Sequence, residues 1–306
     1  MRPVATTMKT TLITGAGGFI GSHLARRLAA DGWSVTPIDP KLPVDPLPSH
    51  LCGRWQSIVG QLRTGGLGFD CIFHLAAHVE SIDKRMAGGL DAYQDIVQDF
   101  EFLKWCEVAK PGRVILMSSC AAMDLVSPDP YCFVKRTLEE FAQRLTVPHI
   151  VLRPFSGYGE GQQLGYSVPD IVQRALRGDE PITYWLGGVR DFIHVSDVVD
   201  AIVLAATNDD WLSYATEHGP IEVGTGIHTG MMSLAYEIKK ATGSNAEVKP
   251  DPTKTFGGQW SPPRVANLKA LHALGWQHKV SLEEGIRRTV EWAKAQRETH
   301  AQAQGR

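Results

Sequence analysis

Short apolar runs alternate along the first half of the chain with longer stretches in which apolar residues recur at helical spacing. Five of these runs have the length and composition of buried strands. They are residues 11–13, 34–38, 71–75, 114–117 and 149–152. Between the first two, Ile20, Leu24 and Leu28 are spaced to share one face of a helix. This alternation predicts a Rossmann-like, doubly wound α/β fold with a parallel sheet covered by helices on both faces.

Beyond Arg153 the regular alternation gives way to glycine-rich and aromatic segments, which predicts a smaller, mixed C-terminal lobe. A capping box formed by Ser281 and Glu284 predicts the start of a last amphipathic helix. The residues expected on the buried face of this helix are Leu282, Ile286, Val290 and Ala293.

Charge and composition narrow the class of protein. The chain has 31 Lys and Arg against 33 Asp and Glu, so neither a polyanion-binding surface nor a nucleic-acid partner is expected. The five cysteines contain no C-x-x-C pair, which argues against a disulfide framework and a metal site and favours a reducing, cytoplasmic setting. No apolar run approaches the roughly 20 residues of a membrane span, and the first residues lack the apolar core of a signal peptide. We therefore expect a soluble protein without a membrane partner.

A glycine-rich segment, TGAGGFIG at residues 14–21, lies between the first predicted strand and the first predicted helix. Glycines allow backbone N–H groups to approach a pyrophosphate, which the positive end of the helix also attracts. The second strand is followed by Asp39, and a carboxylate about 20 residues past the glycines can accept hydrogen bonds from an adenosine ribose while repelling a 2′-phosphate. The sequence therefore predicts a dinucleotide site that prefers NAD to NADP.

These features divide the chain into two predicted domains. Residues 1–154 are expected to bind NAD, and residues 190–228 are expected to return to that domain. Residues 155–189 and 229–306 are expected to form the substrate-binding lobe.

Tyr131 and Lys135 are four residues apart in a stretch that begins with Pro-Asp-Pro at 128–130 and continues with apolar residues at helical spacing. On a helix both side chains share one face. A lysine ammonium beside a phenol favours the phenolate, so the pair can take the proton of an alcohol. The preceding strand leads into Met-Ser-Ser-Cys at 117–120, at the sheet edge where ligands of parallel sheets bind.

Together these motifs resemble those of the extended short-chain dehydrogenase/reductases, in particular the NDP-sugar epimerases and dehydratases. The resemblance covers nearly the whole chain. The matching segments are TGAGGFIGSHL from Thr14, HLAA from His74, SSCA from Ser118, the pair Tyr131 and Lys135, RPFSGYGEGQ from Arg153, RDFIHVSDVVDA from Arg190, EVGTG from Glu222 and LGW from Leu274.

The resemblance implies the roles of individual residues. NAD would be bound by Gly15, Gly18, Phe19, Ile20, Gly21, Asp39, Ala76 and Lys135, the last of which also grips the nicotinamide ribose. The substrate would be a UDP-sugar, with its pyrophosphate neutralised by guanidinium groups and its remaining contacts made by hydroxyls. These substrate-binding residues would be Ser119, Ser156, Arg190 and Arg264. Relatives often form homodimers through helices of the cofactor domain, and Phe133 or Phe141 would then lie at the interface, the alternative for these two side chains being ordinary core packing.

Cys120 is the most informative departure from the family pattern, which commonly has Ser or Thr at this position. A thiol has a pKa of about 8.5 and can exchange protons near neutral pH, whereas a serine hydroxyl hardly does so. Ala121 and Ala122 stand where the family's 4,6-dehydratases carry an Asp-Glu pair, so a standard 4,6-dehydratase is not expected. Cys120 is therefore a candidate catalytic base, the alternative being a small, passive side chain.

Four smaller departures affect single contacts. Asp95 falls where an Asn often sits, Gln61 where an Asp often meets adenine, and Ser156 where an Asn often touches the sugar diphosphate. Asp124 is either a second group for proton transfer or a residue of a turn.

The expected chemistry begins when Tyr131 takes the C4 hydroxyl proton while hydride passes to NAD, which leaves a 4-keto sugar. The ketone acidifies the C5 hydrogen, so that a base such as Cys120 can promote loss of the C6 hydroxyl. Return of hydride to C4 then gives a 5,6-unsaturated sugar. With Cys-Ala-Ala in place of the carboxylate pair, the chain most resembles the NDP-hexosamine 5,6-dehydratases of tunicamycin-type antibiotic biosynthesis, and UDP-GlcNAc is the expected substrate.

Two alternatives remain open at this level. A UDP-hexose or UDP-N-acetylhexosamine 4-epimerase needs only Tyr131, Lys135, NAD and room for the keto sugar to rotate. A catalytically silent NAD-binding regulator would keep the fold without the reaction.

Overall fold

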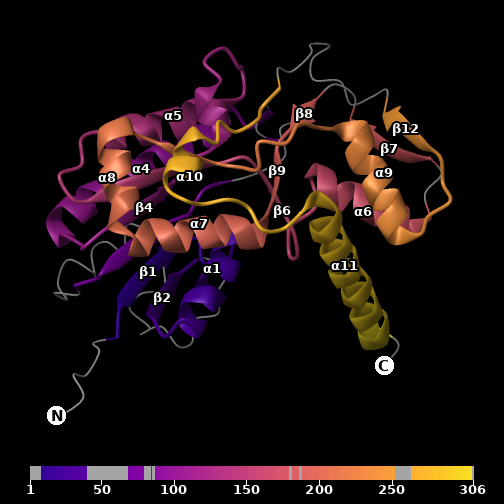
Figure 1. The fold of residues 1–306 in the computed structure, drawn as a ribbon, viewed down its shortest axis with the longest axis horizontal. Coiled ribbons are helices and arrows are strands. Elements are labelled where there is room, and N and C mark those ends of the chain that lie inside the picture. The colour runs from indigo at the N-terminus through magenta and orange to yellow at the C-terminus, as the bar shows by residue number, and fades with distance from the viewer. Residues whose placement is uncertain are drawn as a thin grey trace. The chain divides into compact units, whose positions relative to one another are not determined.

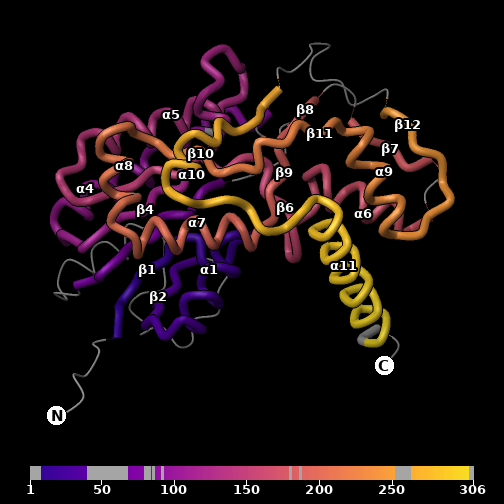
Figure 2. Tube along the Cα trace, in the orientation of Figure 1, coloured from indigo at the N-terminus to yellow at the C-terminus, as the bar shows by residue number. Residues whose placement is uncertain are grey.

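The computed structural model describes residues 8–39, 68–78, 84, 87–178, 181–185, 188–251 and 263–304. The chain divides into two compact units, and Figure 2 lets the chain be followed through each of them. One unit comprises Met1–Arg153 with Val199–Ile221, and the other Pro154–Val198 with Glu222–Arg306. By this division Arg190 lies in the second unit. The assignment of NAD to the first unit and of the substrate to the second stays a prediction.

A six-stranded sheet forms the centre of the first unit, in the order β10-β5-β4-β3-β1-β2. Its strands are β1 (Thr10–Thr14), β2 (Ser34–Ile38), β3 (Cys71–His74), β4 (Val114–Met117), β5 (His149–Pro154) and β10 (Ile221–Val223). The pairs from β2 to β5 are all parallel, so the predicted parallel sheet is confirmed. Because β2 and β3 lie on opposite sides of β1, the sheet has a switch point there, and ligands of such sheets bind at the carboxyl ends of the strands.

Helices cover both faces of this sheet (Figure 1). They are α1 (Phe19–Ala30), α4 (Gln94–Ala109), α5 (Pro130–Ala142), α7 (Val195–Thr207) and α8 (Asp209–His218). Leu12, Ile72 and Leu116 of the strands belong to one buried cluster with residues of α4 and α5. The residues next to them, such as Ile13 and Phe73, are equally buried and must point to the opposite face, because side chains alternate along a strand. Each strand therefore contributes to two cores.

The second unit has a mixed architecture of short strand pairs and helices. The parallel pairs are β6 (Ser156–Tyr158) with β9 (Phe192–His194) and β7 (Ile182–Trp185) with β12 (Val248–Asp251), and the antiparallel pair is β8 (Val189–Arg190) with β11 (Thr229–Gly230). Its helices are α6 (Ser167–Arg177), α9 (Met231–Thr242), α10 (Lys269–Ala273) and α11 (Leu282–Gln304). One buried cluster joins α6, α9 and α11 through residues that include Ile171, Leu234, Ile238, Ile286 and Val290.

Helix α11 starts where the capping box predicted. The Ser281 Oγ accepts a hydrogen bond from the Glu284 N–H at 3.2 Å. The Glu284 carboxylate accepts hydrogen bonds from Arg287 and Arg288, which lower the pKa of Glu284 to about 2. Of the predicted buried face, Ile286, Val290 and Ala293 are buried and Leu282 is partly so. In the part of the chain that the structure describes, every helix is too short or too polar to span a membrane.

Candidate active site and cofactor cradle

A glycine loop joins β1 to α1 at the switch point of the sheet. Gly15 has a φ of +73°, and a Cβ at this position would lie 2.7 Å from the main-chain nitrogen of Ala76. A Cβ at Gly21 would collide with the carbonyl oxygen of Gly15. These two glycines therefore allow the loop, the first turn of α1 and the end of β3 to pack closely, as a pyrophosphate-binding turn requires.

Main-chain donors and one carboxylate complete the cradle. Phe19 and Ile20 begin α1 after its N-cap, Gly18, so their N–H groups belong to the first turn, which lacks helical acceptors. The Gly18 N–H donates a hydrogen bond to the Gly15 carbonyl at 3.0 Å. The Asp39 Oδ2 accepts a hydrogen bond from the Gly17 N–H at 3.1 Å, which places the carboxylate beside the loop. A pyrophosphate beside the helix and a ribose beside Asp39 fit these groups. Gln61, the other residue predicted near adenosine, lies outside the described residues.

A buried chain of hydrogen bonds between the ends of β1 and β3 and helix α4 supports the cradle. Thr14 Oγ1 lies 2.8 Å from His74 Nδ1, and His74 Nε2 lies 2.9 Å from Asp99 Oδ1. Thr14 Oγ1 also accepts a hydrogen bond from the Ala76 N–H at 3.3 Å. The contacts fix Ala76 against the glycine loop. Sequence reasoning missed Asp99, although a histidine at the end of an apolar strand is a signal that a polar partner exists elsewhere in the chain.

Tyr131 and Lys135 come together on the first turns of α5. Asp129 caps this helix by accepting a hydrogen bond from the Tyr131 N–H at 3.0 Å, and Pro130 occupies the first turn. Lys135 is only 3% exposed, and its Nζ donates a hydrogen bond to the Met117 carbonyl at 3.0 Å. The same Nζ lies 5.8 Å from the centroid of the Tyr131 ring. The ammonium is thus held at the carboxyl end of β4, next to the phenol it is predicted to assist.

Cys120 begins a short 3-10 helix, η3 (Cys120–Met123), that packs against α5. Ser119 is the N-cap of η3, and its Oγ accepts a hydrogen bond from the Ala121 N–H at 3.2 Å. Of the four cysteines that the structure describes, Cys120 alone is not buried. By contrast, burial raises the pKa of the Cys71 thiol to about 12. Exposure therefore leaves Cys120 as the described thiol best suited to proton transfer.

Asp124, the other candidate for proton transfer, has the contacts of a turn residue. Its Oδ1 accepts hydrogen bonds from the N–H groups of Val126 and Ser127 at 3.3 and 3.0 Å. Aspartate side chains often stabilise turns in this way.

An ion pair between a buried glutamate and a partly buried arginine, next to the catalytic elements, was missed by sequence reasoning. Glu139 of α5 accepts hydrogen bonds from Nε and Nη2 of Arg153, at 2.8 and 2.5 Å, and from the Ser118 hydroxyl at 2.5 Å. Glu139 and Ser118 are both buried. This one carboxylate therefore ties α5 to the ends of β4 and β5. The signal in the sequence was Arg153 at the end of an apolar strand.

In the second unit, Arg190 and Arg264 are partners in an isolated parallel β-bridge. The Arg264 N–H donates a hydrogen bond to the Val189 carbonyl, and the Asp191 N–H donates one to the Arg264 carbonyl, at 3.2 and 3.0 Å. The Asp191 carbonyl accepts a hydrogen bond from the Ser156 N–H at 2.9 Å. The structure thus brings together the backbones of three of the predicted substrate-binding residues. The Arg190 guanidinium donates a hydrogen bond to the Val189 carbonyl at 3.0 Å and lies over the Trp185 ring, 5.2 Å from its centroid.

Asp191 organises this cluster and was not singled out from the sequence. Its side chain is fully buried and accepts hydrogen bonds from the N–H groups of Thr225, Gly226 and Ala266 and from the Thr225 hydroxyl. A Cβ at Gly224 would lie 2.5 Å from Asp191 Oδ2, so this position has no room for a side chain. Asp191 therefore holds two separate chain segments, at 225–226 and at 266, next to the two arginines.

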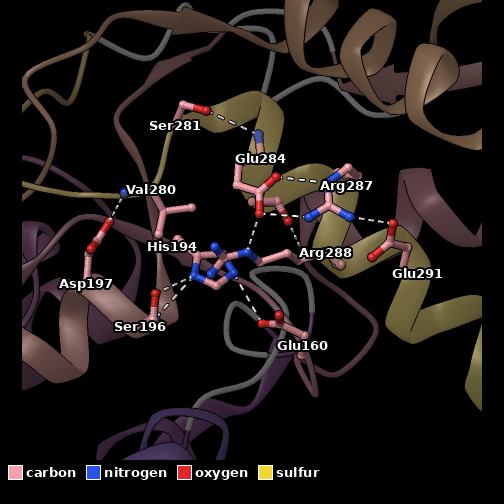
Figure 3. A network of polar contacts seen from close by, with 12 residues as sticks. Glu160, His194, Ser196, Asp197, Val280, Ser281, Glu284, Arg287, Arg288 and Glu291 are labelled. Atoms are coloured by element: carbon pink, nitrogen blue, oxygen red, sulfur yellow. Dashed lines mark hydrogen bonds and ion pairs between the residues drawn. The ribbon is translucent and has the colours of Figure 1, made fainter.

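Two further polar residues of the segment that starts at Arg190 have structural contacts (Figure 3). Asp197 accepts a hydrogen bond from the Val280 N–H at 3.0 Å and so anchors the chain that enters α11. The buried His194 has its Nε2 3.1 Å from the Glu160 carboxylate. Among the described residues, no group of His, Cys, Asp and Glu side chains could hold a metal ion.

A glycine loop at the switch point of a parallel sheet, next to a lysine-supported tyrosine, defines a dinucleotide-dependent enzyme of the short-chain dehydrogenase/reductase type. The chain belongs to the NAD dependent epimerase/dehydratase family, whose profile matches residues 11–214. The protein is therefore an NAD-dependent enzyme of the epimerase or dehydratase class. The predicted cofactor, NAD, is confirmed.

Known proteins resemble the chain over almost its whole length. A UDP-glucose 4-epimerase of Mycolicibacterium smegmatis is 29% identical over 315 residues, which span 92% of this chain and 97% of the relative. The structure of MoeE5 in complex with UDP-glucose and NAD is 26% identical, has a TM-score of 0.75, and covers 94% of this chain and 99% of that one. TunA, an NAD-dependent NDP-hexosamine 5,6-dehydratase of tunicamycin biosynthesis, shares the fold with a TM-score of 0.72 and 24% identity, covering 94% of this chain and 98% of that one.

Proposed function

We propose that the protein is a nucleotide-sugar 5,6-dehydratase that acts on an NDP-hexosamine, with UDP-GlcNAc as its substrate. The observation that carries this proposal is the sequence Cys-Ala-Ala at 120–122. It places a partly exposed thiol and two buried alanines, with no carboxylate, on the element that packs against α5. Arg190 and Arg264 would bind the diphosphate, and Ser119 and Ser156 would contact the substrate.

The glycine loop, Asp39 and Lys135 would hold NAD, which would supply a reversible hydride acceptor for C4 of the sugar. Tyr131, as a phenolate beside the Lys135 ammonium, takes the C4 hydroxyl proton as the C4 ketone forms. The Cys120 thiolate removes the acidified C5 proton and passes it to the departing C6 hydroxyl, so that water leaves and the thiolate is restored. Tyr131 then gives its proton back to the C4 oxygen. The net change is the loss of one water across C5 and C6.

A 4-epimerase is the second candidate. It is favoured by the UDP-glucose 4-epimerase that is 29% identical over 92% of this chain. In that reaction Tyr131 and Lys135 have the same roles, but Cys120 is a passive neighbour and C5 keeps its hydrogen.

Incubation with UDP-GlcNAc in deuterated water distinguishes the two reactions. For the dehydratase we expect a product lighter by one water in the mass spectrum. For the epimerase we expect a product of unchanged mass that keeps the original hydrogen at C5. A product of unchanged mass with no deuterium at C5 would contradict the dehydratase.

The variant Cys120→Ser provides a second test, because it keeps the size of the side chain but removes its acidity. Loss of a general base typically costs 10²- to 10⁴-fold, so we expect water loss to slow by about 10²-fold or more. The initial absorbance change from hydride transfer should persist. The control is Cys132→Ser, which changes a buried thiol of α5. An equal rate of water loss in Cys120→Ser and the wild type would exclude the thiol as the base.

We also propose that the protein is cytoplasmic. The free thiols Cys71 and Cys106 fit a reducing compartment.

We propose further that the protein is a homodimer that pairs through α4 and α5. Val97, Phe100 and Phe133 are exposed apolar side chains on these two helices, and such patches on soluble proteins often mark an interface. We expect Phe100→Glu to shift the species seen by sedimentation from dimer to monomer, with Leu164→Glu, an exposed position outside these helices, as the control. A monomeric wild type at micromolar concentration would refute this interface.

A further inference from the structure

Two aspartates of helix α4, one turn apart, each contact a histidine ring. Asp95 and Asp99 are four residues apart on the buried face of α4, and His74 and His78 are four residues apart at and beyond the end of β3. Asp99 binds His74, as described above. Asp95 places its Oδ1 2.6 Å from His78 Nδ1, and its Oδ2 accepts a hydrogen bond from the His78 N–H at 2.8 Å. One carboxylate thus fixes both the backbone and the ring of His78.

The two pairs differ in exposure. The side chains of His74 and Asp99 are each 1% exposed, which suits a structural role. In the outer pair the Asp95 side chain is 4% exposed, but that of His78 is 56% exposed. Burying the Asp95 carboxylate costs free energy, and the exposed imidazole adds little packing to offset that cost. Packing alone therefore does not explain this pair. Because Nδ1 faces Asp95, a ligand would contact the ring edge that carries Nε2.

The sheet order places His78 between the cradle and the catalytic residues. Along the carboxyl edge, Asp39 follows β2, the glycine loop follows β1, His78 comes shortly after β3, and Cys120 comes shortly after β4. The backbone two residues before His78, at Ala76, lies against Gly15. A dinucleotide with its adenosine at Asp39 would have its nicotinamide at the catalytic helix. His78 would then lie beside the part of the molecule between the diphosphate and the nicotinamide.

A ring contact links the same region to the catalytic helix. Tyr93, at the N-cap of α4, meets Phe133 of α5 edge-on, with 6.0 Å between ring centroids. Phe133 is two residues beyond Tyr131. The N-terminal ends of α4 and α5 are therefore neighbours, so that Asp95 holds His78 on the nicotinamide side of the glycine loop.

The hydrogen-bonding capacity of the Asp95–His78 pair indicates which ligand group it binds. An ionised carboxylate only accepts hydrogen bonds, so the ring nitrogen Nδ1 of His78 donates to Asp95. The other ring nitrogen, Nε2, suits a hydroxyl, because a hydroxyl both donates and accepts hydrogen bonds. We propose that His78 is a further cofactor-binding residue, whose Nε2 forms a hydrogen bond with a hydroxyl of the nicotinamide ribose.

The test measures binding by the full-length protein and does not depend on which sugar is the substrate. The affinity for labelled NAD is measured by equilibrium dialysis, with ADP-ribose and ADP as competitors. ADP-ribose keeps the second ribose, whereas ADP lacks it. One hydrogen bond lost to His78→Ala should weaken NAD and ADP-ribose by about three- to tenfold and leave ADP within about twofold. His78→Gln, which keeps an acceptor oxygen, should recover most of the loss.

The control is His218→Ala, which removes an exposed imidazole at the end of α8 and should change none of the three affinities. Unchanged binding of all three ligands by His78→Ala would overturn the proposal. An equal loss for ADP would also overturn it, because the contact would then be to the diphosphate or to the cradle itself. A failed sugar reaction with the expected binding pattern would count against the proposed substrate and not against His78.

Discussion

Tyr131→Phe is expected to lower kcat for the nucleotide sugar by about 10²- to 10⁴-fold while NAD remains bound. The substitution removes one oxygen, the atom that takes the C4 hydroxyl proton, and leaves the ring in place beside Lys135. The Lys135 Nζ keeps its hydrogen bond to the Met117 carbonyl, so the cofactor-binding part of the site should be undisturbed. Initial rates come from mass spectrometry of the product, and bound NAD is quantified in the supernatant of denatured protein.

Tyr236→Phe is the matched control, because Tyr236 is exposed on α9 and has no predicted role in the reaction. This control should retain full activity. A Tyr131→Phe enzyme that turns over at the wild-type rate would remove the tyrosine from the mechanism. A wild type that binds NAD but converts no nucleotide sugar would instead favour the regulator.

Glu139→Gln is expected to lower the free energy of unfolding by about 2 kcal/mol, less than for a fully buried ion pair, because the Arg153 side chain is 22% exposed. The amide has nearly the shape of the carboxylate, but it leaves the Arg153 guanidinium without its negative partner and turns a donor toward it. The Ser118 hydroxyl also loses a charged acceptor. Urea unfolding followed by circular dichroism measures the change.

Glu140→Gln is the control for this experiment, since Glu140 is the next residue of α5 and is exposed. The control should unfold within about 0.5 kcal/mol of the wild type. Replacement of both Glu139 and Arg153 by Met should restore part of the lost stability, because apolar residues of similar volume often replace a buried pair without cost. Equal unfolding midpoints for Glu139→Gln and Glu140→Gln would show that the pair contributes little.

The sequence by itself determined the features that depend on residues close together in the chain. The five strands were identified from apolar runs, and the fourth and fifth begin where predicted, at Val114 and His149. The strand predicted to include Leu75 ends one residue earlier, at His74. The glycine loop and the spacing of Tyr131 and Lys135 were recognisable for the same reason: a turn and a helical face are local structures with fixed periods.

Only the tertiary structure decided which distant polar groups are partners. Asp95 pairs with His78, Glu139 with Arg153, and the buried Asp191 with Thr225 and Ala266. A hydrophobic period shows which face of an element is buried, but it does not show which polar side chain on another element meets that face. Such pairs form because a charge removed from water must find a partner, and the folded chain alone determines which partner lies within reach.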